Sequence, residues 1–210
     1  MPEPTVAGVV LAVAARLAES RDALNRLDAI AGDGDLGVTA GHAAEALREL
    51  APTLDGVPAA DALKSIGMAL ARRAPSTGGT LLAFACLAAA RVESAEAGGV
   101  RTIAAHLDAA RDEIARRGKV APGDRTMLDA LDPAATAFRA AADDGRALPE
   151  CLASAAAAAD RGATATSTME PTTGRAGWLA DRARGTEDAG ARLVAILFEA
   201  AASAVGGPES

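Results

Sequence analysis

Residues 149–165 read PECLASAAAAADRGATA, and this alanine-rich stretch is the plainest indication of the fold class. Alanine is the best helix former, so the stretch predicts an α-helix. The rest of the 210-residue chain has the same bias, because alanine makes up more than a quarter of it and aromatic residues only 2%. Few segments are rich in the β-branched and aromatic residues that strands favour. We therefore expect an all-α protein whose small side chains let the helices pack closely.

Apolar residues recur at helical spacing in seven further segments on either side of this stretch. In chain order, the eight expected helical segments are residues 6–27, 40–50, 63–70, 77–92, 103–118, 124–138, 149–165 and 188–205. Asp124 is the expected N-cap of the sixth segment, and Gly118 is expected to end the fifth. Most links are short, so sequential helices should pack as antiparallel neighbours. Without an internal repeat or a domain-splitting linker, residues 1–210 are expected to form a single domain.

The charge and cysteine content exclude several classes of protein. A net charge of −7 and a pI of about 4.9 argue against nucleic acid or an anionic membrane as the main partner. Two isolated cysteines, Cys86 and Cys151, indicate neither a disulfide framework nor a zinc cluster. The N-terminus does not read as a signal peptide, and the longest apolar run, residues 81–90, is too short to span a bilayer. The cytoplasm is the expected location.

Two links are unlike the short turns of a plain helical bundle. The first is contained in LDAIAGDGDLGVT, residues 27–39, where Asp28, Asp33 and Asp35 lie close together among glycines. Crowded carboxylates repel one another, and a divalent cation removes that cost. Hard oxygen ligands suit Mg²⁺, which proteins usually share with substrate phosphates. A solvated acidic turn is the alternative interpretation of this loop by itself.

The second unusual link, residues 169–188, is about twenty residues long and contains Arg175, Arg182 and Arg184. Loops of this length are uncommon inside compact domains and are often functional. Both histidines, in contrast, lie in helical stretches outside every such loop. We expect His42 and His106 to have surface or packing roles.

Three familiar phosphate or metal motifs do not fit the acidic loop. Gly32-x-Gly34-x-x-Gly37 matches the dinucleotide fingerprint, but it follows a helical pattern, and its aspartates would repel a bare pyrophosphate. A calcium-binding loop beginning at Asp33 would need Gly where Val38 stands and Glu where Ala44 stands. The chain also contains no Walker motif.

Other loops could bind phosphate or simply cap helices. APSTGGT, residues 74–80, opens the fourth expected helix, where free N–H groups and the positive end of the helix dipole suit phosphate. An ordinary N-cap explains the same residues. Three further stretches read singly as loops and caps: GKVAPGDRTMLD at 118–129, GRAGWL at 174–179 and GTEDAGA at 185–191.

Taken together and in this order, these stretches resemble the nucleotide-binding L subunit, or L domain, of dihydroxyacetone kinases. The family pattern runs Asp-x-x-x-x-Gly-Asp-Gly-Asp-x-Gly, then Gly-Gly-x-Ser-Gly, Gly-Asp-Lys-Thr-Met, Gly-Arg-Ala-x-x-Leu and Asp-Pro-Gly-Ala. All five blocks have counterparts here, spread over nearly the whole chain. Any one block is a weak signal, but five in register are a strong one.

The resemblance implies an eight-helix antiparallel up-and-down barrel that binds a nucleotide at one end through its inter-helix loops. It makes Asp28, Asp33 and Asp35 the ligands of two Mg²⁺ ions that bridge the phosphates. It also implies a larger set of nucleotide contacts. These are Leu36, Gly37, Val38, Thr39, Ser76 and Thr77 at the phosphates, Gly118 and Met127 beside the adenine, Arg175 as the nucleotide-contacting and catalytic arginine, and Asp188, Ala189 and Gly190 in the last block.

The implied activity is that of a phosphotransferase subunit. The chain would hold ATP, or a tightly bound ADP that a phosphotransferase-system protein rephosphorylates. The phosphoryl group would pass to dihydroxyacetone or a similar keto-sugar held by a separate K subunit, with Arg175 and helix N-termini meeting the developing charge. The alternative is a nucleotide-binding module that regulates a partner such as a transcription factor. The phosphoryl donor, the sugar and a homodimeric state stay open.

Several residues depart from the family pattern. Leu36 stands where many members have His or another polar residue, and Arg125 replaces Lys. Ala74-Pro75 replaces Gly-Gly, and Ala189 replaces Pro. These departures are an argument for a diverged paralogue, the alternative interpretation, whereas the complete aspartate trio and Arg175 argue against an inactive copy.

Overall fold

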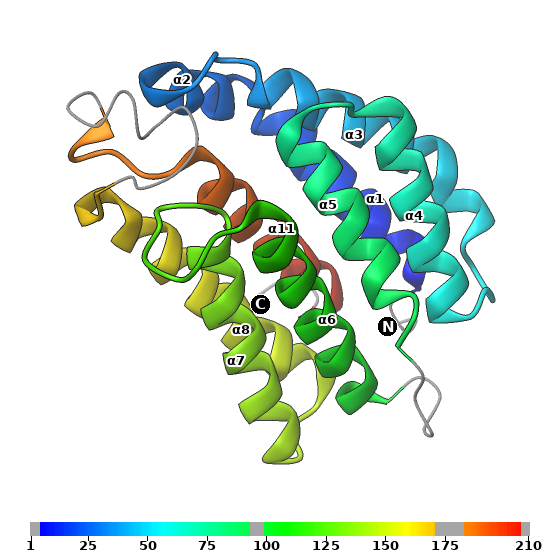
Figure 1. Ribbon diagram of the computed structural model, residues 1–210. Coiled ribbons are helices and arrows are strands. Elements are labelled where there is room, and N and C mark those ends of the chain that lie inside the picture. The colour runs from blue at the N-terminus through cyan, green and yellow to red at the C-terminus, as the bar shows by residue number, and fades with distance from the viewer. Residues whose placement is uncertain (1–4, 93–98, 171–182, 207–210) are drawn as a thin grey trace.

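The computed structural model describes residues 5–92, 99–170 and 183–206, and this part of the chain is helical with no strand (Figure 1). The α-helices are α1 (Val6–Glu19), α2 (Arg21–Ala31), α3 (Leu36–Leu50), α4 (Ala59–Arg73), α5 (Thr77–Ala89), α6 (Val100–Gly118), α7 (Leu128–Asp143), α8 (Leu148–Ala165) and α11 (Ala189–Gly206). Two 3-10 turns, η1 (Ala51–Thr53) and η2 (Thr166–Thr168), follow α3 and α8. The predicted all-α class is confirmed.

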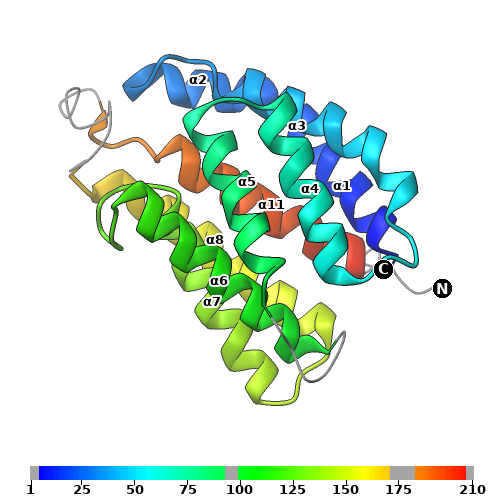
Figure 2. The same cartoon turned by 45° about the vertical axis from the view of Figure 1, so that its right-hand side comes forward.

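Eight of the helices in the described ranges pack in cyclic order. Starting from α1, the contacts run through α3, α4, α5, α6, α7, α8 and α11, and α11 returns to α1. Figure 2 shows α11 between α8 and α1, where it closes the ring. The links from α3 to α4, from α4 to α5, from α6 to α7 and from α7 to α8 are short and reverse the chain, so the expected antiparallel barrel is confirmed. The remaining helix, α2, lies outside the cycle and packs on α3 and α11.

The first expected helical segment is in fact two helices, α1 and α2, which meet at Ser20. Backbone hydrogen bonds continue across this point, from Ser20 N to Arg16 O (3.0 Å) and from Leu24 N to Ser20 O (2.9 Å). No glycine or proline marks the break. The reason lies in the packing, because α1 joins the ring beside α3 and α11 whereas α2 turns to cover α3 and the start of α11.

The predicted start of the sixth helix at Asp124 is wrong, since α7 begins at Leu128. The next residue, Arg125, has a φ of 62°, a left-handed conformation that a right-handed helix cannot continue through. Gly118 is the last residue of α6, as expected, but the left-handed cap is Lys119, with a φ of 53°.

The core consists of two clusters of small and medium-sized apolar side chains. One gathers α6, α7, α8 and α11 around the fully buried Phe138, and the other gathers α1, α3 and α4 around Leu24 and Leu54. The last helix, α11, supplies Phe198 to the first cluster and Ile196 to the second. Within the described ranges, α11 is long and apolar enough to cross a membrane, a criterion that core helices also meet. Its packing between the two clusters accounts for its composition.

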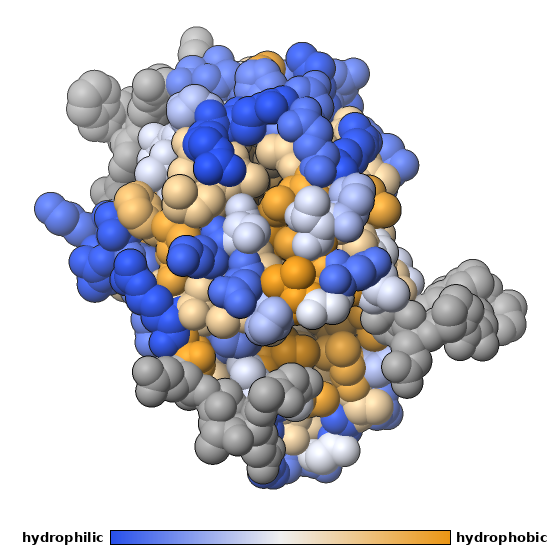
Figure 3. Space-filling view, turned by 90° about the vertical axis from the view of Figure 1, so that its right-hand side faces the viewer, coloured by the Kyte–Doolittle hydropathy of each residue, from blue (hydrophilic) through white to orange (hydrophobic). Residues whose placement is uncertain are grey.

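The surface mixes polar and apolar regions, as expected for helices rich in alanine. Figure 3 shows apolar side chains gathered near the middle of one face, with hydrophilic ones above them.

His106 is buried, and its Nδ1 lies 2.8 Å from the carbonyl oxygen of Ala89, so the expected packing role is confirmed. His42 is exposed on α3. Both cysteines are free, and burial raises the pKa of Cys86 to about 11.

Candidate functional site

The up-and-down order brings alternate connections to one end of the ring. The turns at residues 32–35, 74–76 and 119–127 lie there, together with the chain on either side of residues 171–182. The N-termini of α3, α5, α7 and α11 therefore point to this same end. Helix N-termini carry partial positive charge and attract anions. The loops that carry four of the five motif blocks meet here, while the block with Arg175 lies outside the described residues.

Close contacts confirm that these segments are neighbours. A Cβ placed on Gly78 of α5 would lie 3.6 Å from Leu36 Cδ1 and 3.8 Å from Met127 Cε. A Cβ placed on Gly190 of α11 would lie 3.4 Å from Met127 Cβ. Met127 thus lies between the heads of α5 and α11, and Leu36 approaches Gly78 from the head of α3. The structure brings together residues that are far apart in the sequence.

The predicted metal loop forms a cluster of carboxylates at this end. Oxygens of Asp28, Asp33 and Asp35 all lie within 4.8 Å of one another. Asp28 comes from the last turn of α2, and its Oδ2 accepts hydrogen bonds from Asp35 N (3.0 Å) and Leu36 N (3.3 Å). These bonds fold the turn back onto α2, so one carboxylate both shapes the loop and faces the other two.

Glycine is required at several positions of this turn, either because neighbouring atoms come too close for a side chain or because the backbone is left-handed. A Cβ on Gly32 would lie 2.2 Å from Asp28 Oδ1, and Gly34 has a φ of 77°. At the head of α3, a Cβ on Gly37 would lie 1.9 Å from the carbonyl oxygen of Arg21. Substitution at these positions would displace either the carboxylate or the helix start.

The cluster suits a hard divalent cation. Its donors are carboxylate oxygens, the type that Mg²⁺ prefers, and Asp33 and Asp35 are exposed. One supporting residue was missed by the sequence analysis: Asn25 Oδ1 accepts a hydrogen bond from Val38 N (3.2 Å). Its position three residues before Asp28 places both on neighbouring parts of α2 and was an available signal. Two amides at the head of α3, those of Leu36 and Val38, thus bond to side chains of α2.

At the head of α5, the capping interpretation of Ser76 is confirmed. Its Oγ accepts a hydrogen bond from Gly79 N (3.1 Å), while Thr77 is exposed. A Cβ on Gly79 would lie 2.1 Å from the carbonyl oxygen of Ala74, which explains the glycine. Ala74, one of the departures from the family pattern, is buried in the core.

The loop between α6 and α7 is held by two buried charged side chains that the sequence analysis did not assign. Asp129 accepts hydrogen bonds from Thr126 N (2.7 Å) and from Gly123 N. The guanidinium of Arg125 donates to the carbonyl oxygens of Thr166, Ala183 and Thr186. Within the described residues, the hydrogen-bond acceptors of Arg125 are backbone or hydroxyl oxygens of neighbouring segments. Gly118 and Met127 flank this loop at its two ends.

Asp188 caps the head of α11. Its Oδ1 accepts a hydrogen bond from Ala191 N (2.7 Å), and its own N–H donates to the buried hydroxyl of Thr166 (2.8 Å). Burial raises the pKa of Asp188 to about 6, although the cap and the charge of Arg125 act in the opposite direction. Ala189 is buried, so of the last block only Asp188 and Gly190 are partly accessible.

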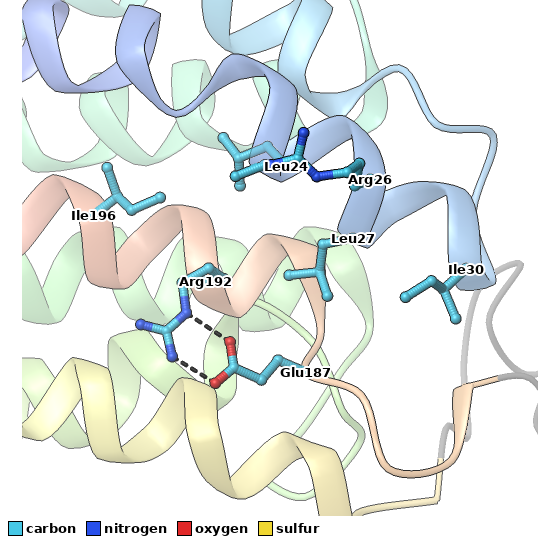
Figure 4. Close-up of a pocket in the computed structure, with 8 residues that line it drawn as sticks. Leu24, Arg26, Leu27, Ile30, Glu187, Arg192 and Ile196 are labelled. Atoms are coloured by element: carbon cyan, nitrogen blue, oxygen red, sulfur yellow. Dashed lines mark hydrogen bonds and ion pairs between the residues drawn. The ribbon is translucent and has the colours of Figure 1, made fainter.

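A shallow groove of about 360 Å³ lies beside this end, between α2 and α11 (Figure 4). Leu27 and Ile30 of α2 face Arg192, which makes a bidentate ion pair with Glu187. The lining is mainly apolar apart from this pair and Arg26. The groove is therefore distinct in chemistry from the carboxylate cluster, which lies at the end of α2.

Comparison with known sequences gives a consistent family match. Residues 30–203 match the model of the DAK2 domain. The chain is 35% identical over 211 residues to "Triokinase/FMN cyclase" of Mus musculus, covering 95% of this chain and 36% of the relative. It spans about a third of the length of such relatives. It is also 28% identical to "PEP-dependent dihydroxyacetone kinase, ADP-binding subunit DhaL" of Escherichia coli (strain K12), covering 84% of each chain.

A solved structure has the same fold. The dihydroxyacetone kinase from C. freundii in complex with AMP-PNP and Mg2+ superposes with a TM-score of 0.74 at 31% sequence identity. The match covers 94% of this chain and 33% of that one. The ring of helices described above therefore corresponds to about a third of that solved chain.

Proposed function

Because this chain belongs to the DAK2 domain family, we propose that it is the nucleotide- and magnesium-binding part of a kinase for dihydroxyacetone or a related small keto-sugar. One observation carries the proposal: three carboxylates lie within 4.8 Å of one another at the end where four helix N-termini converge. Carboxylates supply metal ligands, and helix N-termini favour phosphate. The solved relative that was crystallised with AMP-PNP and Mg2+ supports the same ligand pair.

In this proposal, Asp28, Asp33 and Asp35 hold Mg²⁺, with two ions as the expected number. Bound Mg²⁺ would neutralise phosphate charge during phosphoryl transfer. The role of the chain is to hold the carboxylates close together despite their repulsion. Asp28 does so through its two backbone hydrogen bonds, and Gly32 does so by leaving room beside it.

The nucleotide would lie across the ring's end, with its phosphates at the heads of α3 and α5 and its base beside the loop that precedes α7. The proposed contacts are Leu36, Gly37, Val38, Thr39, Ser76 and Thr77 for the phosphates, Gly118 and Met127 for the base, and Asp188, Ala189 and Gly190 for the closing segment. Arg175 is the proposed catalytic cation. The neighbouring positions of Leu36, Gly78, Met127 and Gly190 support this arrangement, because they join the separate blocks into one surface.

The sugar acceptor would come from a partner. Covalent capture of a ketone needs a positioned histidine or lysine. Of the two histidines, His106 is buried against Ala89 and His42 is exposed on α3, outside the site's loops. We propose that a K subunit presents the sugar, and that residues 1–210 act as one nucleotide-binding domain. A phosphotransferase-system protein is the proposed donor if ADP stays bound. The relative whose name describes it as an ADP-binding subunit supports this division.

Binding is tested first. Mg²⁺ with ADP at a hundredfold excess over Kd should raise the free energy of unfolding by roughly 2.7 kcal/mol. Thermal unfolding followed by calorimetry would measure the gain, with EDTA as the control. Equal stabilisation by ADP in excess EDTA would contradict the metal assignment.

Activity is tested next, by incubating the purified chain with ATP, Mg²⁺ and dihydroxyacetone, alone and with a candidate K subunit. We expect sugar phosphate only in the mixture. Product from the chain alone would contradict the division of labour between subunits. Tight nucleotide binding without product, whatever K subunit is added, would favour a regulatory module instead.

A further inference from the structure

We infer that Arg125 is a positioning residue for the nucleotide base: its buried guanidinium joins three segments and thereby fixes where Met127 and Asp188 lie. The inference rests on the proposed function. It concerns a residue that lies beside, and not among, the proposed ligand contacts.

Arg125 is held in an otherwise unfavourable state. It is only 3% exposed and has a left-handed backbone, with a φ of 62°. Burying a guanidinium and placing a non-glycine residue in this conformation both cost free energy. Such a residue persists where its surroundings determine it strongly. The surroundings here are hydrogen-bond acceptors on segments far away in the sequence.

The guanidinium makes a specific set of bonds. Its Nε donates to the carbonyl oxygen of Thr166 (3.1 Å), at the end of α8. Its Nη2 donates to the carbonyl oxygens of Ala183 and Thr186 (2.8 Å each) and to Thr186 Oγ1 (3.2 Å). A planar guanidinium can reach acceptors from two different nitrogens, whereas a lysine ammonium has all its donors on one atom. Arginine therefore suits this position better than lysine.

Two residues near the proposed position of the nucleotide base, Met127 and Asp188, depend on these bonds. Met127 follows Arg125 by two residues and lies against Gly78 and Gly190. Thr166, whose carbonyl accepts from Arg125, also accepts through its hydroxyl from Asp188 N (2.8 Å). Loss of the guanidinium would free the loop before α7 from the segment that leads into α11. Met127 and Asp188 would then lose their fixed separation.

The part of the site that is proposed to bind Mg²⁺ is held by other contacts. Asp28 bonds to Asp35 N and Leu36 N, and Asn25 bonds to Val38 N, all within the α2–α3 corner. The bonds of Arg125 lie in the other half of the ring's end, among the residues after α6, after α8 and before α11. A defect at Arg125 should therefore weaken recognition of the base while leaving the metal and phosphate half intact.

The test compares two probes in calorimetric titrations with Mg²⁺ present: ADP, which has a base, and inorganic pyrophosphate, which has none. In Arg125→Met we expect the Kd for ADP to rise at least tenfold and the Kd for pyrophosphate to stay within twofold. Arg125→Lys should lie between the two, which is the rescue expected of a partial donor set. Thr186→Val removes the hydroxyl that accepts from Arg125 and donates to the carbonyl oxygen of Ala183, and it should raise the Kd for ADP a few-fold. Arg161→Met, an exposed arginine on α8, is the matched control and should match the wild type.

The outcomes separate the inference from the proposed function. Equal weakening of both probes in Arg125→Met and Thr186→Val would overturn the inference, because it would indicate a general loss of structure. Unchanged ADP binding in Arg125→Met would also overturn it. If Arg125→Met does not fold, the ratio of the two Kd values in Arg125→Lys and Thr186→Val decides in the same way. Wild-type protein that binds neither probe would overturn the proposed function and this inference with it.

Discussion

Two groups of aspartates at the same end of the ring are built in opposite ways. Asp28, Asp33 and Asp35 place three carboxylates within 4.8 Å of one another, two of them exposed. Asp129 and Asp188, a loop away, are buried or partly buried and accept hydrogen bonds from backbone N–H groups of their own chain. Asp188 also has the buried guanidinium of Arg125 among its neighbours.

The difference indicates what each group is for. Carboxylates that cap and brace the chain are satisfied within the fold, so removing one should affect stability. Carboxylates that face one another repel, and an external cation relieves that repulsion. Asp28 does both, because it also accepts two backbone hydrogen bonds, so the contrast is tested at Asp33 and Asp35, whose removal should mainly affect binding. Three predictions test this contrast.

The largest effect is expected at Asp129. Replacing it in Asp129→Asn removes the charge that accepts from Gly123 N and Thr126 N and turns one acceptor into a donor. Hydrogen bonds to charged groups contribute roughly 1.5–3 kcal/mol each, so we expect the free energy of unfolding to fall by about 3 kcal/mol. Urea denaturation measures this. Asp143→Asn, exposed at the end of α7, should change it by less than about 0.5 kcal/mol. Equal effects at the two positions would contradict the contrast.

A smaller effect, mainly on binding, is expected at the carboxylate cluster. Asp33→Asn or Asp35→Asn should weaken Mg²⁺-dependent ADP binding at least tenfold, which is roughly 1.4 kcal/mol. The free energy of unfolding without ligand should fall by less than in Asp129→Asn, because removing one of three like charges relieves repulsion. Titration calorimetry and urea denaturation measure the two quantities. Asp22→Asn, an exposed residue in the first turn of α2, is the control. A variant that binds Mg-ADP like the wild type would show that its residue is not a ligand.

The smallest effect is the pH dependence contributed by Asp188. Burial raises its pKa from 3.8 to about 6, so between these values the folded protein holds a proton that the unfolded chain has lost. The contribution of this carboxyl to stability is therefore fully present below about pH 4 and is lost as the pH rises through 6. Partial exposure should limit the change to about 1 kcal/mol.

The variant Asp188→Asn isolates this contribution. It keeps an oxygen for the Ala191 N–H but does not titrate. The difference in unfolding free energy, wild type minus variant, should decrease between pH 4 and pH 7 and be flat above it. Denaturation curves over that range measure the difference. A difference that increases with pH would contradict the raised pKa.

Several features followed from local sequence alone. Alanine content and apolar spacing predicted the helices, because helix formation depends mainly on short-range propensity and on one buried face. The acidic loop was identified because glycines and carboxylates alternate within a few residues. The structure gives the physical reason for two of these glycines, Gly32 and Gly34, in a close approach to Asp28 and a positive φ. The cap at Ser76 was likewise a local matter.

Other features depended on segments that are distant in the sequence. Nothing local marks the break at Ser20, which follows from where α1 and α2 pack. The start of α7 at Leu128 depends on Arg125, whose left-handed backbone is held by acceptors at Thr166 and Ala183. A pattern of residue types cannot reveal acceptors some forty to sixty residues away.

The sequence by itself determined the helical class, the acidic loop and the order of the motif blocks, since each depends on neighbouring residues. Only the tertiary structure decided that Leu36, Gly78, Met127 and Gly190 meet at one end, and that Arg125 joins the loop before α7 to the segments after α8 and before α11. The physical reason is the antiparallel ring. It sends every second connection to the same end, so loops far apart along the chain become neighbours in space.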